Sequence, residues 1–239
     1  IGLNITIPYK EKIYFYIDNK KSLIPSIDGI PQVKNPPINC ITLRKAHEAG
    51  YVYRIHGKNT DGVGFHNALN GAVTSNWDLK DKKCAIVLGY GGAAKAIIDE
   101  LKTDSSFARI MVFNRTFDKI KKLKEKEKGL FVYEIEPYEI EDLPKHINKA
   151  HLIINTTPIN ILSGQTKWKI NPECYGFDIV YKPWDGTGFL RNFEEKKRIE
   201  GIHMLVHQAA PCFKDWFGID PKIDTSLFQH LYKKMGKNK

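Results

Sequence analysis

The first third of the chain carries short segments of different character. Charged and aromatic residues over 11–21 predict a helix, and the prolines and glycine of 22–39 predict a loop, because neither residue type continues a regular element. Residues 40–43 and 52–55 predict the two strands of a hairpin. Residues 62–70 predict a helix that leads into the next unit.

From Cys84 the pattern changes to a repeat of strand, turn and helix. Residues 84–88, CAIVL, form a continuous apolar run, which is typical of a parallel strand buried on both faces. A helix is predicted over 93–102, a second strand over 109–113, and then a lysine-rich helix that exposes the run Lys119–Lys128. The remaining expected elements are strands over 130–133, 151–155 and 176–180 and helices over 188–198 and 204–217. This alternation predicts a doubly wound α/β domain.

The last predicted helix contains Pro211. A proline inside a helix removes a backbone hydrogen bond at a cost of about 3 kcal/mol. We therefore expect either a kink at Pro211 or a helix that begins later than residue 204. The segment from Gly201 onward is expected to pack back on the first unit.

Composition and charge change this picture little. The 239 residues suffice for one large domain or two modest ones, and the formal net charge is +10. Nucleic-acid binding is the alternative that such a charge raises, but no nucleic-acid motif accompanies it, so we expect a lysine-rich surface without a nucleic-acid partner. A positive field also suits an anionic substrate and a phosphorylated cofactor. No apolar stretch is long enough to cross a bilayer, so no membrane partner is expected.

The cysteines, Cys40, Cys84, Cys174 and Cys212, form no CxxC pair and are too few for a disulfide scaffold. Their pattern predicts no metal site. It favours a reducing environment and therefore a cytoplasmic protein.

The phrase LGYGGAA over 88–94 follows a predicted strand and opens a predicted helix. This is the setting of a G-x-G-x-x-A dinucleotide fingerprint. Gly89 permits the tight turn, Gly91 lets the backbone approach a pyrophosphate, and Ala94 allows close packing of helix on strand. The N–H groups at the start of the helix would face the phosphates. An ordinary strand-to-helix turn is the alternative.

The next strand ends in Asn114-Arg115-Thr116, with Lys119 close by. An NAD site normally has Asp or Glu at this point to bind the ribose 2′-hydroxyl. Arg115 can instead bind a 2′-phosphate through its planar guanidinium. The sequence therefore predicts NADP over NAD; the alternative is that Arg115 is an ordinary surface arginine.

Two phrases before the nucleotide loop carry titratable groups: GLNITIPYK ends at Lys10, and KNTDGVG contains Asp61. An ammonium and a carboxylate can move a proton to or from a hydroxyl. Hydride transfer at a ring carbon needs such a proton transfer at its oxygen. The order of these motifs therefore indicates a dehydrogenase that acts on a small alcohol. Asp61 alone could instead cap the helix that follows it.

Seven phrases in order resemble the shikimate 5-dehydrogenase family, and they span nearly the whole chain. They are GLNITIPYK (2–10), KNTDGVGF (58–65), GYGGAAKA (89–96), NRT (114–116), NTTP (155–158), DIVYKP (178–183) and GIHMLVHQAAPCF (201–213). The resemblance implies a Rossmann-like, doubly wound NADP domain joined to an α/β substrate domain. It implies the reversible NADPH-dependent reduction of 3-dehydroshikimate to shikimate, within chorismate and aromatic amino acid biosynthesis.

The resemblance also implies roles by position. Lys10 would be the catalytic acid or base, with Asp61 as its partner on the reacting hydroxyl. Substrate contacts would come from Thr6, Asn59, Thr60, Tyr181 and Gln208, although Gln208 on its own could be a neutral surface residue. Cofactor contacts would come from Gly89, Tyr90, Gly91, Gly92, Ala93, Asn114, Arg115, Thr116, Lys119, Thr156, Ile179 and Gly201, with Ile179 and Gly201 near the nicotinamide.

These roles divide the chain into three parts. We expect a substrate domain over 1–61, an NADP-binding domain over 62–200, and C-terminal helices over 201–239 that pack on the substrate domain. The assembly is expected to be a monomer or a homodimer.

The chain departs from the family pattern at three points. The family has a βαβ stretch with a Ser-x-Ser pair before the lysine phrase, and because nothing here matches it, we expect a fragment that lacks the amino-terminal part of the substrate domain. Aligning Thr42 and Leu43 puts Ile41 where the family has a substrate-binding Asn, with Asn39 as an alternative. Tyr90 replaces a small residue of the nucleotide loop, which is harmless if its ring points outward and unfavourable if it points at the pyrophosphate.

Two other functions stay open on the sequence. The first is a quinate/shikimate dehydrogenase with relaxed substrate or cofactor choice, which the change at Ile41 favours. The second is an NADP-binding fragment without turnover.

Overall fold

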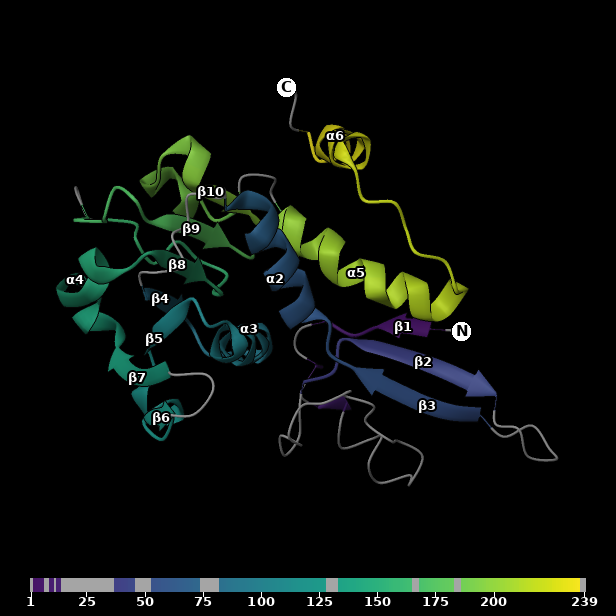
Figure 1. Ribbon diagram of the computed structural model, residues 1–239, viewed down its shortest axis with the longest axis horizontal. Coiled ribbons are helices and arrows are strands. Elements are labelled where there is room, and N and C mark those ends of the chain that lie inside the picture. The colour runs from purple at the N-terminus through teal and green to yellow at the C-terminus, as the bar shows by residue number, and fades with distance from the viewer. Residues whose placement is uncertain are drawn as a thin grey trace.

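The computed structural model describes residues 2–6, 9–10, 12–13, 37–45, 53–73, 82–127, 133–164, 168–182 and 186–236. Two sheets lie on either side of a pair of helices (Figure 1). The small antiparallel sheet contains β1 (Gly2–Asn4), β2 (Cys40–Lys45) and β3 (Tyr53–Lys58). The hairpin predicted over 40–55 is thereby confirmed, with longer strands.

The large sheet has seven strands in the described part of the chain. In spatial order they are β10 (Arg198–Glu200), β9 (Tyr175–Asp178), β8 (Leu152–Asn155), β4 (Lys83–Leu88), β5 (Phe107–Asn114), β7 (Tyr133–Glu139) and β6 (Glu125–Glu127). All neighbours pair in parallel except β6, which runs antiparallel to β7. After β4 the chain adds β5 and β7 on one side of that strand, and it then returns to place β8 on the other side. A ligand crevice is expected beyond the carboxyl ends of β4 and β8, where the order reverses.

The helices are α2 (Asp61–Ala72), α3 (Gly92–Thr103), α4 (Leu143–His146), α5 (Gly201–Phe217) and α6 (Thr225–Lys234). Short 3₁₀ turns cover Phe117–Lys119, Ile140–Asp142, Ile147–Lys149, Phe189–Asn192 and Glu195–Lys197. Among the described residues, no helix combines the length and apolarity that crossing a membrane requires.

Both faces of the large sheet are buried, as the apolar run 84–88 predicts. Ala85 and Val87 pack with α2, α3 and α5 on one face, whereas Ile86 and Leu88 pack with α4 and the 3₁₀ turns on the other. This division follows from the alternation of side chains along a strand. The doubly wound α/β fold is confirmed.

Helix α5 joins the two sheets. It packs along α2, where a Cβ atom on Gly64 would lie 2.7 Å from Gln208 Cβ, so only glycine allows this approach. At its far end Trp216 Nε1 donates to the Ile41 carbonyl of β2 at 3.1 Å. Helix α5 therefore contacts the small sheet, whereas α6 lies near the other end of α5, where the Phe228 ring packs against His203 (Figure 1).

The lysine-rich segment does not form the predicted helix. Instead a 3₁₀ turn over Phe117–Lys119 is followed by β6, an edge strand. Lysine and glutamate alternate over 124–127, and charged residues are common on edge strands. The strand expected over 130–133 is β7, which begins at Tyr133 and continues to Glu139; residues 130–132 lie outside the described part.

Two helix predictions near the C-terminus are wrong in extent. Residues 188–198 form two 3₁₀ turns and the start of β10, because Phe189 and Phe193 anchor a short segment to the sheet. Helix α5 begins earlier than predicted, at Gly201, and continues past Pro211. The expected helix over 11–21 and most of the loop over 22–39 lie outside the described residues.

Candidate active site

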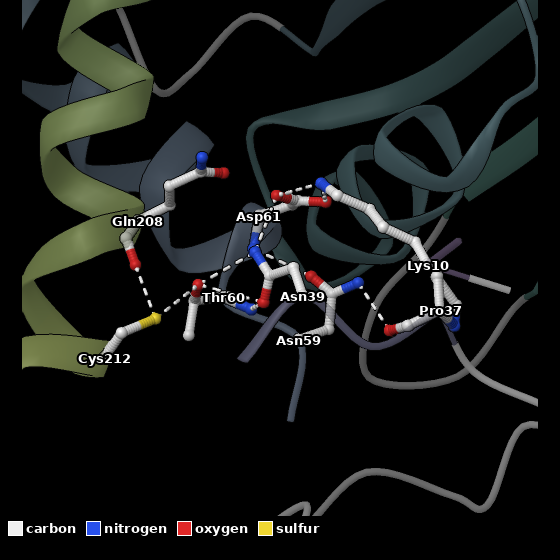
Figure 2. A network of polar contacts seen from close by, with 8 residues as sticks. All are labelled: Lys10, Pro37, Asn39, Asn59, Thr60, Asp61, Gln208 and Cys212. Atoms are coloured by element: carbon white, nitrogen blue, oxygen red, sulfur yellow. Dashed lines mark hydrogen bonds and ion pairs between the residues drawn. The ribbon is translucent and has the colours of Figure 1, made fainter. Parts of the chain in front are cut away.

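Lys10 and Asp61 form an ion pair at the junction of the two sheets (Figure 2). Lys10 Nζ lies 2.6 Å from Asp61 Oδ2 and 2.9 Å from Oδ1, and the two side chains are 14% and 1% exposed. Thr60 occupies the N-cap position, so Asp61 is the first residue of α2 rather than its cap. The positive end of the helix dipole stabilises a carboxylate there.

Asn39 fixes the Asp61 carboxylate from behind. Its Nδ2 donates to Asp61 Oδ1 at 2.8 Å and to Thr60 Oγ1 at 3.0 Å, while its Oδ1 accepts from the Thr60 backbone N–H at 2.8 Å. Ile41 instead packs with Ile38 in an apolar cluster of the small sheet. Of the two alternatives at this position, the structure therefore places Asn39, and not Ile41, at the Lys10–Asp61 ion pair.

Asn59 has a supporting position. Its Oδ1 accepts from the Asp61 backbone N–H at 2.7 Å, and its Nδ2 donates to the Pro37 carbonyl at 2.8 Å. Both polar atoms of the Asn59 side chain are therefore bonded to the protein's own backbone. Asn59 thus shapes the turn that begins α2.

A cavity of about 310 Å³ opens in front of the ion pair. The residues predicted to react with or bind the substrate that line this cavity are Thr6, Lys10, Thr60, Asp61, Tyr181 and Gln208. The residues predicted to bind the cofactor that line it are Ala93, Ile179 and Gly201. Figure 2 shows Lys10 and Gln208 on opposite sides of Asp61. The structure therefore brings together residues that span some 200 positions of the sequence.

Two polar residues at the cavity escaped the sequence analysis as site residues: Asn4 and Cys212. Asn4 lies two positions before Thr6, and residues two apart in an extended segment share a face. Cys212 lies one helical turn after Gln208 on α5. Spacing from an already predicted residue could have identified both.

The nucleotide loop has the backbone geometry that its glycines suggest. Gly89 has a φ of 98°, and its N–H donates to the Phe113 carbonyl of β5. Thr156 Oγ1 donates to the Leu88 carbonyl at 2.7 Å, which ties the loop to β8. A Cβ atom on Gly92 would lie 3.7 Å from Lys10 Cβ, so the N-terminus of α3 lies beside the Lys10–Asp61 ion pair.

The start of α3 is open toward a ligand. A Cβ atom on Gly91, the N-cap residue, would meet no atom of the described residues within 4 Å, and no described side chain caps the helix. The Tyr90 ring packs against the core cluster that contains α3, and Lys95 Nζ lies 5.3 Å from its centroid. The Tyr90 ring therefore lies against the core of the protein.

The predicted 2′-phosphate residues lie at the carboxyl end of β5. Asn114 Nδ2 donates to the Thr116 carbonyl at 2.9 Å, which shapes the turn, while Arg115, Thr116 and Lys119 are exposed. They lie outside the cavity in front of Asp61. No group of three His, Cys, Asp or Glu suited to a metal ion occurs within the described ranges.

Gly89→Ala is expected to destabilise the protein by about 2 kcal/mol, because a side chain at a positive φ is strained and its Cβ would lie 2.7 Å from Thr156 Oγ1. Gly71→Ala is the matched control: nothing lies within 4 Å of its added Cβ in α2. Urea unfolding of both variants checks this. Equal stability of the two variants would contradict the role of Gly89.

The strand order and the glycine loop define the class: an α/β protein with a Rossmann-like nucleotide-binding fold. The family described as shikimate / quinate 5-dehydrogenase matches residues 72–164. A shikimate dehydrogenase (NADP(+)) of Rhizobium meliloti is 30% identical over 99% of this chain and 77% of its own length, and one of a Jannaschia species is 32% identical over 95% and 76%. The chain belongs to the shikimate dehydrogenase family.

Solved structures agree with this assignment. A shikimate 5-dehydrogenase of Thermus thermophilus, determined in complex with shikimate, is 27% identical and superposes with a TM-score of 0.68 over 98% of this chain and 78% of its own. The enzyme of Aquifex aeolicus is 25% identical, with a TM-score of 0.65 over 99% and 77%.

Proposed function

We propose that this protein is an NADP-dependent shikimate dehydrogenase that reversibly reduces the ketone of 3-dehydroshikimate to the hydroxyl of shikimate. The observation that carries the proposal is the ion pair between Lys10 and Asp61, which faces a cavity beside the N-terminus of α3. The relatives named shikimate dehydrogenase (NADP(+)) support the same substrate and cofactor. This reaction would serve chorismate and aromatic amino acid biosynthesis.

The chain's own residues would handle the proton and the substrate hydroxyls. Lys10 donates a proton to the carbonyl oxygen as it gains negative charge, and accepts one from the hydroxyl in the reverse direction. Asp61 holds the ammonium in place and is itself held by Asn39, so the pair is preorganised. Thr6, Tyr181 and Gln208 line the cavity where they can bind the remaining hydroxyls.

The open start of α3 fits a dinucleotide. The space before Gly91 would hold the pyrophosphate against free N–H groups, and Arg115 at the end of β5 would bind the 2′-phosphate. Ile179 and Gly201, which line the cavity, would lie near the nicotinamide. The cofactor supplies the hydride when bound.

Steady-state rates with shikimate and quinate, each with NADP and NAD, test the proposal. We expect the highest kcat/KM for shikimate with NADP. A preference for quinate would instead support the quinate/shikimate dehydrogenase alternative. Binding of NADP without turnover of either alcohol would support the non-catalytic alternative and refute the proposed function.

Arg115→Ala is expected to raise the KM for NADP by about tenfold to a hundredfold, because a charge-assisted hydrogen bond to a phosphate contributes about 1.5 to 3 kcal/mol. The KM for NAD should change little, since NAD has no 2′-phosphate. Lys122→Ala, an exposed cation a few residues farther on, is the control. A parallel rise in both KM values would show that Arg115 does not read the 2′-phosphate.

We also propose the division of the chain into a substrate domain over 1–61, an NADP-binding domain over 62–200 and C-terminal helices over 201–239. The contact of α5 with both sheets supports it. The four cysteines are free thiols, which supports a cytoplasmic location. Sedimentation analysis would distinguish the monomer from the homodimer.

A further inference from the structure

Two cysteines lie close together beside the active-site cavity, and one of them, Cys212, lines it. Cys40 begins β2 and Cys212 lies in α5, which packs on β2, and a side-chain hydrogen bond between the two thiols is the largest influence on the pKa of each. Both are free, and they are 0% and 2% exposed. The proposed reaction uses neither thiol, so catalysis does not explain why the two cysteines lie together.

Cys212 connects the thiol pair to the catalytic network. Its Sγ lies 3.6 Å from Thr60 Oγ1 and donates to the Gln208 carbonyl at 3.4 Å (Figure 2). Thr60 in turn is bonded to Asn39, which holds Asp61. Cys212 also lines the cavity, so a small molecule that enters it lies next to this residue.

The surroundings make the Cys212 thiol easier to ionise, and on ionisation it gives up its bond to the Gln208 carbonyl. The hydrogen bond from Cys40 lowers the pKa of the Cys212 thiol, and Thr60 and the Lys58 ammonium act in the same direction against the effects of burial and Asp215. The same hydrogen bond and burial raise the pKa of Cys40. One thiolate beside one thiol is the arrangement in which an oxidised cysteine is resolved by its neighbour.

The other two cysteines lack these features. Cys84 and Cys174 are buried in the apolar cluster on the α4 side of the large sheet. Burial raises the pKa of both thiols. They are therefore internal controls for oxidation.

We propose that Cys40 and Cys212 form a reversible disulfide that switches this enzyme off in the presence of hydroperoxides, a regulation that rests on the proposed function. The Cys212 thiolate attacks a peroxide oxygen, the O–O bond breaks, and a sulfenic acid and one water form. The Cys40 sulfur then displaces the hydroxyl of the sulfenic acid as a second water, and the S–S bond forms. The two thiols lose two electrons and two protons, and hydrogen peroxide becomes two waters.

The disulfide would act on catalysis through Thr60. It turns the Cys212 sulfur toward β2 and removes its contact with Thr60 Oγ1, the hydroxyl that also accepts from Asn39. Asn39 then holds Asp61 less firmly, and α5, which carries Gln208, is tied to β2.

Oxidation of the full chain with hydrogen peroxide, followed by alkylation and peptide mass mapping, tests the proposal. We expect a linked peptide pair containing Cys40 and Cys212, the loss of two alkylatable thiols, and a fall of more than tenfold in shikimate oxidation that dithiothreitol reverses. Shikimate should slow the linkage, because it occupies the cavity that the peroxide enters.

Two variants sharpen the result, each compared with its own untreated sample. Cys40→Ala should give no linked peptide and no inactivation that dithiothreitol reverses, whereas Cys174→Ala should behave as the wild type. Wild-type protein without the linked peptide would overturn the disulfide, and linked protein with undiminished turnover would overturn the switch. Linkage in a protein that is inactive before treatment would refute the proposed function instead.

Discussion

Lys10→Ala is expected to lower kcat for shikimate oxidation by about 10²- to 10⁴-fold, the usual contribution of a positioned acid or base. The KM for NADP should change little, because the Lys10 ammonium is held by Asp61 rather than by a residue of the nucleotide loop. Single-turnover measurements would show whether the loss lies in the chemical step. A kcat near that of the wild type would remove Lys10 from the reaction.

A stability effect must be separated from this loss. Without the ammonium, the Asp61 carboxylate stays buried and keeps only its bonds to Asn39 and the helix start, so the variant should also be less stable. Lys10→Arg retains the positive charge and the ion pair, yet a guanidinium does not release its proton. We expect this variant to be stable and still slow. Lys12→Ala, an exposed lysine two residues on, should match the wild type in both respects.

Periodicity predicted the nucleotide half of the fold well. Residues 84–88 are apolar throughout, and a strand of this kind is stable where both faces of its sheet are covered. The glycines of 89–92 then located the start of α3 to within a residue. Where a segment's own pattern determines its burial, the sequence is sufficient.

The failures occurred where distant partners decide the structure. Residues Glu125–Glu127 carry no apolar stripe and become a strand only because β7 offers a free edge. Pro211 remains inside α5 although it cannot donate a backbone hydrogen bond, because packing against α2 and β2 holds the helix on both sides. Its carbonyl accepts from Lys58 Nζ at 3.2 Å. These are tertiary contacts that propensity does not contain.

The candidate site divides in the same way. The residues of the short phrases, such as Lys10, Asp61 and Gln208, could be predicted because a motif fixes their spacing. The choice between Asn39 and Ile41 could not be made, because it depends on how the segment before β2 is placed over α2. Motif alignment gave this position to Ile41, whose side chain lies among the isoleucines of the small sheet.

Asn39→Ala and Ile41→Asn therefore form a decisive pair. Asn39→Ala should cost roughly 3 kcal/mol of stability, because it leaves the buried Thr60 N–H unpaired and removes a donor from Asp61. It should also lower kcat/KM by about tenfold to a hundredfold per folded molecule, since each 1.4 kcal/mol of transition-state stabilisation is tenfold in rate. Ile41→Asn should destabilise by about 1 to 3 kcal/mol, the cost of an unpaired buried amide, but leave kcat/KM per folded molecule unchanged.

The double variant Asn39→Ala/Ile41→Asn decides whether Asn39, as the structure indicates, or position 41, as the motif alignment indicates, holds the functional asparagine. If Asn39 is the residue that holds Asp61, an asparagine at position 41 cannot replace it, and the double variant will be as slow as Asn39→Ala and less stable than either single variant. Urea unfolding corrects each rate for the folded fraction, and Ile41→Val controls for the loss of apolar volume at about 1 kcal/mol. Recovery of activity in the double variant would mean that position 41 reaches the substrate. Because Asn39 and the Cys212 thiol both act through Thr60, loss of activity on Asn39→Ala would also show that this network is sensitive enough for the disulfide to control.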